Sequence, residues 1–96
     1  MRKYEVMYIL KADLEEASRK EVMDKLASII TDNGGKVEST DESMGLRELA
    51  YPIKDQTKGY YVVLKVSMDN RAINEFNRLV RINPSVLRHL IVVEHK

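Results

Sequence analysis

Polar and hydrophobic residues alternate along the first ten positions of the chain, which is the two-residue period of a β-strand. Residues 2–10 are therefore predicted to form a strand with two different faces. One face carries Tyr4, Val6, Tyr8 and Leu10, and the other carries Lys3, Glu5, Met7 and Ile9. We expect the first of these faces to be buried.

Helical spacing replaces the alternation after residue 14. Apolar residues recur at roughly three- and four-residue steps, as on one stripe of a helix: Leu14, Ala17, Val22, Leu26, Ile29 and Ile30. This pattern predicts a helix over residues 15–32. Asp13 lies three residues before Glu16, which predicts a capping box at its start. Asn33-Gly34-Gly35 predicts its end, because glycine adopts the left-handed conformation with little steric cost.

Two further strands follow, over residues 36–53 and 60–68, with a hairpin turn predicted at 55–59. The first half of residues 36–53 is polar, which is typical of an edge strand, and Gly45 indicates a bulge or kink. The second strand has the strongest alternation in the chain. One face has Tyr60, Val62, Leu64, Val66 and Met68, and the other has Tyr61, Val63, Lys65 and Ser67.

Asp69 is predicted to cap a second helix, which carries Ile73, Phe76, Leu79 and Val80 and ends before Asn83-Pro84. Residues 86–94 are apolar on both faces, as expected of a central strand or of one covered by a partner. The order is strand, helix, strand, strand, helix, strand. With right-handed crossovers it predicts an α+β, ferredoxin-like split βαβ sandwich, with two helices on one face of a four-stranded antiparallel sheet. Residues 1–96 are expected to form a single domain.

Such a fold leaves one face of the sheet without a covering layer. The predicted strand faces place Met7, Ile9, Tyr61 and Val63 there, with Lys3, Glu5 and Lys65 around them. Uncovered apolar groups of this kind form a candidate surface for a protein partner. The alternative is ordinary scattered apolar exposure, which is common on protein surfaces.

The distribution of charge along the chain says more about possible partners than the net charge of +1 does. Residues 13–48 carry ten acidic and five basic side chains, whereas residues 49–96 carry eight basic and four acidic ones. A chain with this asymmetry can present one basic side to a polyanion although its total charge is near zero. Ordinary solvated surface charge is the alternative.

Several functional classes lack support in the sequence. There is no cysteine, which removes disulfides, thiol catalysis and cysteine-ligated metals. No apolar run approaches the roughly 18 residues that cross a bilayer, and no signal-peptide core follows Met1, so a cytoplasmic location is expected. His89 and His95 have no accompanying nucleophile, and Gly34-Gly35 lacks a phosphate-binding context. We expect no enzyme activity, cofactor, metal or small-molecule substrate.

Residues 58–65 partly match the third-strand motif of the commonest RNA-binding module, which stacks bases on aromatic rings. Lys58, Gly59, Tyr60 and Val63 agree with the motif. Val62 and Lys65 stand where two aromatic rings are required. Base stacking on the sheet is therefore rejected as the main mode of binding.

Two segments carry a more specific resemblance. Residues 1–6 (MRKYEV) and 45–54 (GLRELAYPIK) closely resemble the bacterial small-subunit ribosomal protein six family. The second segment agrees at every position with that family's pattern of glycine, any residue, basic, polar, Leu-Ala-Tyr, any residue, Ile, and basic or polar. Length, element order and Asn83-Pro84 before the last strand also agree, so the resemblance covers essentially the whole chain.

The resemblance implies a structural constituent of the 30S subunit. Members of this family lie in the platform of the small subunit, where they bind the central domain of 16S ribosomal RNA cooperatively, as a heterodimer with ribosomal protein eighteen. It implies contacts with RNA or with that partner at basic positions, namely Arg2, Lys3, Arg47, Lys54 and Arg88. Glu48 stands where some members have a second arginine. The chain ends at Lys96 where some continue into a long acidic tail, so no function of such a tail is expected.

Two other function classes remain as alternatives to a ribosomal component. One is an independent module that binds single-stranded RNA through the partial third-strand motif. The other is a small regulatory or enzymatic ferredoxin-like domain, such as a ligand sensor. A ribosomal component remains with washed 30S particles, whereas the other two are washed away.

Overall fold

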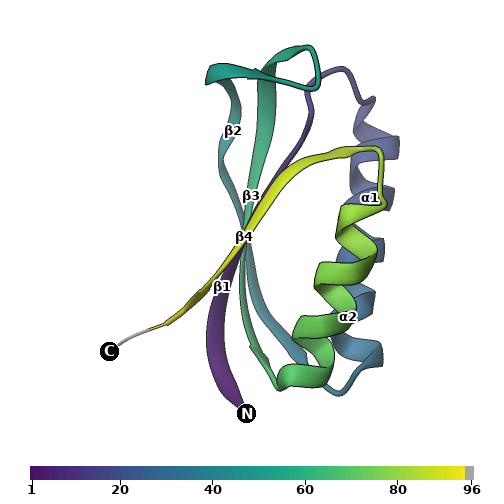
Figure 1. The fold of residues 1–96 in the computed structure, drawn as a ribbon, viewed down its shortest axis with the longest axis vertical. Helices are drawn as coiled ribbons and strands as arrows, with labels where there is room; N and C mark the ends of the chain where they lie inside the picture. Colours follow the sequence, from purple (N-terminus) through teal and green to yellow (C-terminus); the bar gives the residue numbers. More distant parts are fainter. Residues whose placement is uncertain (95–96) are drawn as a thin grey trace.

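The computed structural model describes residues 1–94 and has the predicted order of elements. They are β1 (Arg2–Lys11), α1 (Glu16–Asp32), β2 (Lys36–Ile53), β3 (Gln56–Met68), α2 (Asn70–Arg81) and β4 (Val86–Val93). The strands form one antiparallel sheet in the order β2-β3-β1-β4. Both helices cover the same face of this sheet, and the other face has no covering layer (Figure 1). The ferredoxin-like prediction is confirmed.

The core lies between the central strands and the two helices. Val6 pairs with Leu64 and Tyr8 pairs with Val62, so the inward side chains of β1 and β3 stand side by side. The predicted burial of the first strand face is confirmed, and the apolar stripes of the helices and of β3 are buried with it: Tyr4, Val6, Tyr8, Leu10, Leu26, Ile30, Val62, Leu64 and Phe76. Each large side chain buried in this way contributes about 1.5–3 kcal/mol to folding before entropy is counted.

The start of α1 differs from the prediction. Glu15 is the N-cap, and its side chain makes no capping hydrogen bond, so the capping box predicted at Asp13 is wrong. Leu14 packs against the core and keeps the chain out of the helix until residue 16. Ala17 is exposed, because it lies well off the stripe formed by Val22 and Leu26. Asp69 is the N-cap of α2, as predicted, again without a side-chain hydrogen bond.

The end of α1 follows the prediction. Gly34 has a φ of +84°, the left-handed conformation expected after the C-cap Asn33. The N–H of Gly35 donates to the carbonyl of Ile30 at 2.8 Å, and the N–H of Gly34 donates to that of Thr31 at 3.2 Å. These two bonds satisfy carbonyls that the helix end would otherwise leave without partners.

The hairpin turn lies earlier than predicted. It consists of Lys54 and Asp55, both at positive φ (+48° and +65°), and β3 already begins at Gln56, opposite Ile53. Two successive left-handed residues match the right-handed twist of the flanking strands, so the hairpin closes in two residues instead of five. Lysine seldom adopts this conformation. The ammonium of Lys54 donates to the carbonyl of Val86 at 3.3 Å, and this hydrogen bond holds the turn against β4.

The edges of the sheet are β2 and β4. The prediction for β2 is confirmed, since its polar half lies on the edge and its register shifts between Asp41 and Gly45, where φ is +56°. A central position for β4 is wrong. The crossover through α2 adds β4 outside β1, and this leaves Leu90 and Val92 about half exposed, at 52% and 46%.

Ile9 also differs from the prediction of an uncovered residue, because only 7% of it is exposed. Ile9 pairs with Tyr61, so it belongs to the face of the sheet without helices, which we call the bare face. A side chain at Gly59 would meet it there: the Cγ2 of Ile9 lies 2.3 Å from where a Cβ would stand, and a methyl of Leu49 lies 3.3 Å from that point. Ile9 therefore fills the space that glycine leaves open.

This packing predicts the effect of Gly59→Ala. The added methyl forces Ile9 or the strand to move, so the variant should lose about 1–3 kcal/mol of unfolding free energy, measured by denaturant titration. In an Ile9→Ala background, where Cγ2 is absent, the same change should cost clearly less. Equal costs in both backgrounds would show that this contact does not determine the residue at position 59.

Candidate nucleic-acid interface

Basic side chains gather at the end of the sheet formed by the β2–β3 hairpin. Gly59 pairs with Lys11 on one side and with Arg47 on the other, which sets these two cations roughly 10 Å apart across three strands. The Nε of Arg47 donates to the carbonyl of Met44 at 3.0 Å and fixes the direction of the side chain. Arg47 is exposed, and its terminal nitrogens make no hydrogen bond within residues 1–94.

Contacts between β2, the turn and β4 bring two more cations to this end. The guanidinium of Arg88 donates to the hydroxyl of Tyr51, which lies 37 positions earlier in the chain. The ammonium of Lys54 reaches the carbonyl of Val86 in the same strand as Arg88. Tyr51 and Lys54 both belong to the family pattern in residues 45–54, and these contacts give that pattern a structural role. We call Arg47, Lys54 and Arg88 the hairpin-end cluster.

Arg2 and Lys3 lie at the opposite end of the sheet. Arg2 pairs with Met68 and lies seven residues along β1 from Ile9, the partner of Arg88, so roughly 23 Å separates Arg2 from that part of the hairpin-end cluster. The ammonium of Lys3 lies 3.9 Å from a carboxylate oxygen of Glu38. An exposed pair of this kind is worth less than about 1 kcal/mol, but it lowers the local positive charge. The predicted basic residues therefore form two separate groups.

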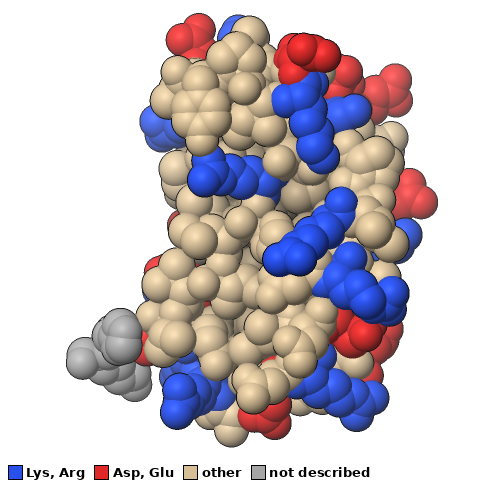
Figure 2. Space-filling view, in the orientation of Figure 1, with Lys and Arg blue, Asp and Glu red and all other residues tan. Residues whose placement is uncertain are grey.

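The bare face of the sheet carries an apolar strip beside the hairpin-end cluster. Met7 pairs with Val63 on one side and with Leu90 on the other, and Tyr61 lies next to Val63 on the same face. Leu90 was missed as a site residue because β4 was expected to be central or covered. The sequence did contain a signal for Leu90, because β4 has apolar residues on both of its faces and only one face can pack against the helices. Figure 2 shows basic side chains over the side of the molecule that presents β4, with uncharged surface between them.

The orientation of β3 rules out base stacking through the third-strand motif. Val62 is fully buried against the helices, so its neighbour Tyr60 points to the helical layer as well. The Tyr60 ring packs under the Arg19 guanidinium, 4.1 Å from its centroid, and its hydroxyl donates to Glu42 at 2.9 Å. This hydrogen bond raises the pKa of Tyr60. Tyr60 and Val62 therefore both point away from the bare face, and Lys65, which lies on that face, has no ring to stack on a base.

His89 is a partly packed ring. Its Nε2 lies 2.9 Å from Oδ1 of Asn77, and the ring meets Phe76 edge-on with 6.3 Å between centroids. Burial and then the nearby charge of Arg81 hold the pKa of His89 below its ordinary value of 6.5. Among residues 1–94, no group of three potential metal ligands comes together. His95 lies outside the described residues.

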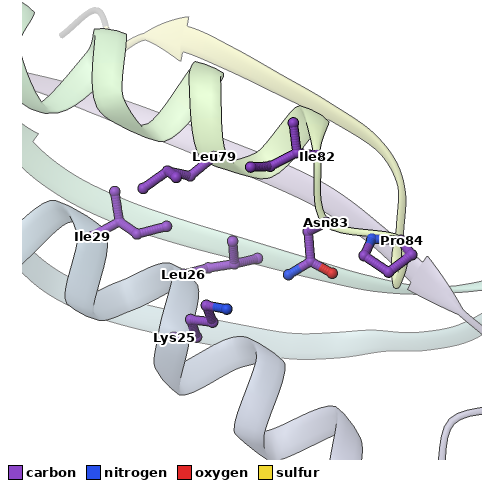
Figure 3. A pocket seen from close by; sticks show the side chains of 7 residues that line it. All are labelled: Lys25, Leu26, Ile29, Leu79, Ile82, Asn83 and Pro84. Carbon is purple, nitrogen blue, oxygen red and sulfur yellow. The ribbon is translucent and has the colours of Figure 1, made fainter.

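The hollow between the helices offers no catalytic chemistry either. It is lined by Lys25, Leu26, Ile29, Leu79, Ile82, Asn83 and Pro84, which Figure 3 shows around the end of α2. One cation and one amide stand among aliphatic groups, without a nucleophile or an acid–base pair. No helix within the described part of the chain is long and apolar enough to cross a membrane.

Comparisons with known proteins agree with this geometry. The family model described as ribosomal protein S6 matches residues 3–93. The small ribosomal subunit protein bS6 of Shouchella clausii (strain KSM-K16) is 45% identical over 96 residues, which is the whole of both chains. The crystal structure of 30S ribosomal protein S6 from Thermotoga maritima superposes with a TM-score of 0.90 at 28% identity. The match covers 97% of this chain and 87% of that one.

The lowered pKa of His89 predicts a pH dependence of stability. As pH falls below 6.5, the unfolded chain binds a proton at this ring more readily than the folded chain. The free energy of unfolding should therefore decrease as the pH falls from about 7 through the folded-state pKa. Denaturant titrations of His89→Gln should show a smaller loss over this window, with His95→Gln as the control. An unchanged loss in His89→Gln would contradict the assignment.

Proposed function

Because the chain belongs to the ribosomal protein S6 family, we propose that it binds the central domain of 16S ribosomal RNA together with ribosomal protein eighteen. Members of this family are structural, non-enzymatic proteins, and this chain is accordingly a constituent of the small (30S) ribosomal subunit in the cell's translation machinery. What we propose beyond family membership is the specific RNA domain, the cooperative partner and a role in assembling the platform.

The proposed RNA contact rests on the hairpin-end cluster. Arginine guanidinium groups present several donors in a plane, which suits bidentate contact with phosphate oxygens. The Nε of Arg47 is held by the carbonyl of Met44, so the side chain is already partly ordered and loses less entropy on binding. Arg88 is similarly positioned by Tyr51. A rigid set of cations can recognise the backbone shape of a folded RNA without reading its bases.

The apolar strip supports the second half of the proposal. Met7, Tyr61, Val63 and Leu90 would be buried by ribosomal protein eighteen, whose own surface would add to the RNA contact. A net charge of +1 gives weak attraction to RNA when the protein is alone. Joining two weak binding surfaces in one heterodimer raises the affinity without requiring either surface to be strong. We assign Arg2 and Lys3 to a separate contact, because they lie at the far end of the sheet.

The RNA contact is tested by Arg47→Ala. Loss of one phosphate contact should weaken binding to a 16S central-domain fragment in the presence of ribosomal protein eighteen. The slope of log affinity against log salt should fall by about 1. Stability should change by less than about 0.5 kcal/mol, since the side chain is exposed. Arg71→Ala, which removes an exposed arginine of α2 on the helical side, is the matched control. Unchanged binding of Arg47→Ala at every salt concentration would refute this site.

The partner contact is tested by Met7→Ser combined with Val63→Ser. Removing apolar area from the strip should weaken binding to ribosomal protein eighteen in the absence of RNA, measured by calorimetry. The salt dependence should stay the same, because no charge is lost. Ile82→Ser, an exposed apolar residue on the helical side, is the control. If both variants bind the partner equally well, the partner does not lie on the strip.

A further inference from the structure

The two edges of the sheet are protected to different degrees. Along β2 there are three register shifts, Pro52 and many charged side chains, all of which hinder pairing with another chain. In β4 the five residues from His89 to Val93 carry no Asp, Glu, Lys, Arg or Pro, and their register with β1 is regular. Figure 2 shows mostly uncharged surface over this half of β4. The β4 edge is therefore a competent template for a further strand.

The backbone groups that β4 directs outward can be identified from its pairing with β1. The N–H of Glu94 donates to the carbonyl of Lys3 at 3.0 Å, so Glu94 faces β1. Because successive residues of an antiparallel strand direct their N–H and C=O to opposite sides, the odd-numbered residues of this stretch face away. These are His89, Ile91 and Val93. No strand within residues 1–94 pairs with that edge.

The sequence of this edge is complementary to itself. In an antiparallel arrangement of two copies centred on Ile91, the outward backbone N–H and C=O groups of His89 meet those of Val93. Those of Ile91 meet the same groups of its own copy. On the bare face, Leu90 then stands opposite Val92, and Arg88 stands opposite Glu94. Shifting the register by two residues keeps the backbone bonds but sets Arg88 against Val92 in one direction and Leu90 against Glu94 in the other. The centred arrangement therefore satisfies backbone, apolar and charged groups together.

We propose that a second copy of this chain pairs along β4 in this register, forming a continuous eight-stranded sheet around a twofold axis. Each Arg88 meets the Glu94 of the other copy, which gives two ion pairs per dimer. The half-exposed Leu90 and Val92 of the two copies stand next to each other between these pairs and shield part of each other's apolar surface from water. One strand pair is a small interface, so the dimer is weak and depends on protein concentration. The proposal requires neither RNA nor ribosomal protein eighteen.

Charge exchange tests the register. The full chain is studied by sedimentation equilibrium from roughly 10 μM to roughly 1 mM, the range in which small interfaces dissociate. Arg88→Glu and Glu94→Arg each place like charges opposite one another and should raise the dimer dissociation constant by about tenfold or more. The double variant restores opposite charges and should recover the dimer. Circular dichroism confirms that all three variants are folded.

A cysteine variant provides a second measurement. Ile91→Cys places the only cysteine of the chain on the twofold axis, where paired Cα atoms lie about 5.5 Å apart and within reach of a disulfide. Mild oxidation should yield a covalent dimer much faster than it does for Ser39→Cys on the β2 edge. A monomer at every concentration, equal cross-linking of the two variants, or no recovery in the charge-exchanged double variant overturns the proposal. Each of these results would leave the proposed RNA contact untouched.

Discussion

The placement of both helices on one face of the sheet is the constraint from which the functional surfaces follow. Burying one side of β1 and β3 requires every second residue to be apolar, and the helical layer supplies the cover for that side only. The alternate residues remain outside, and several of them, including Met7, Tyr61 and Val63, are nevertheless apolar. A chain that had only to fold would gain solubility from polar groups there. The apolar strip is thus an addition to what folding requires, as expected in a component of an assembly.

The antiparallel order of the strands also assembles the hairpin-end cluster. The end of β2 and the start of β4 are far apart in sequence, but both lie at the same end of the sheet as the tight turn. Tyr51 reaches Arg88, and Lys54 reaches Val86 from a backbone conformation that lysine seldom adopts. The unfavourable conformation is stabilised by a contact with another strand. Cations held in this way can form a specific anion-binding surface although the net charge of the chain is only +1.

The sequence predicts features set by local periodicity better than features set by long-range packing. The strands, the helices and the glycine end of α1 follow from alternation, helical spacing and backbone freedom, so they were predicted. The capping box failed because Leu14 is drawn into the core, and the turn was misplaced because strand twist favours a two-residue connection. Ile9 was expected to be exposed because only the paired strands show that it fills the space over Gly59. The basic residues were identified from the family pattern, but only the register of β1 separates Arg2 from Arg47.

Arg88 lies where the hairpin-end cluster, the bare face and the β4 edge meet. Its guanidinium contacts Tyr51 within the chain, and the same group is assigned here to phosphate in one state and to Glu94 of a second copy in the other. A guanidinium engaged by phosphate is less available to a carboxylate, so the two states compete for one charge. By linkage, RNA that engages Arg88 weakens self-pairing to the same degree that self-pairing weakens its hold on RNA. The exposed edge of β4 is then least available to another copy when the protein is bound to RNA, and most available when the protein is free and concentrated.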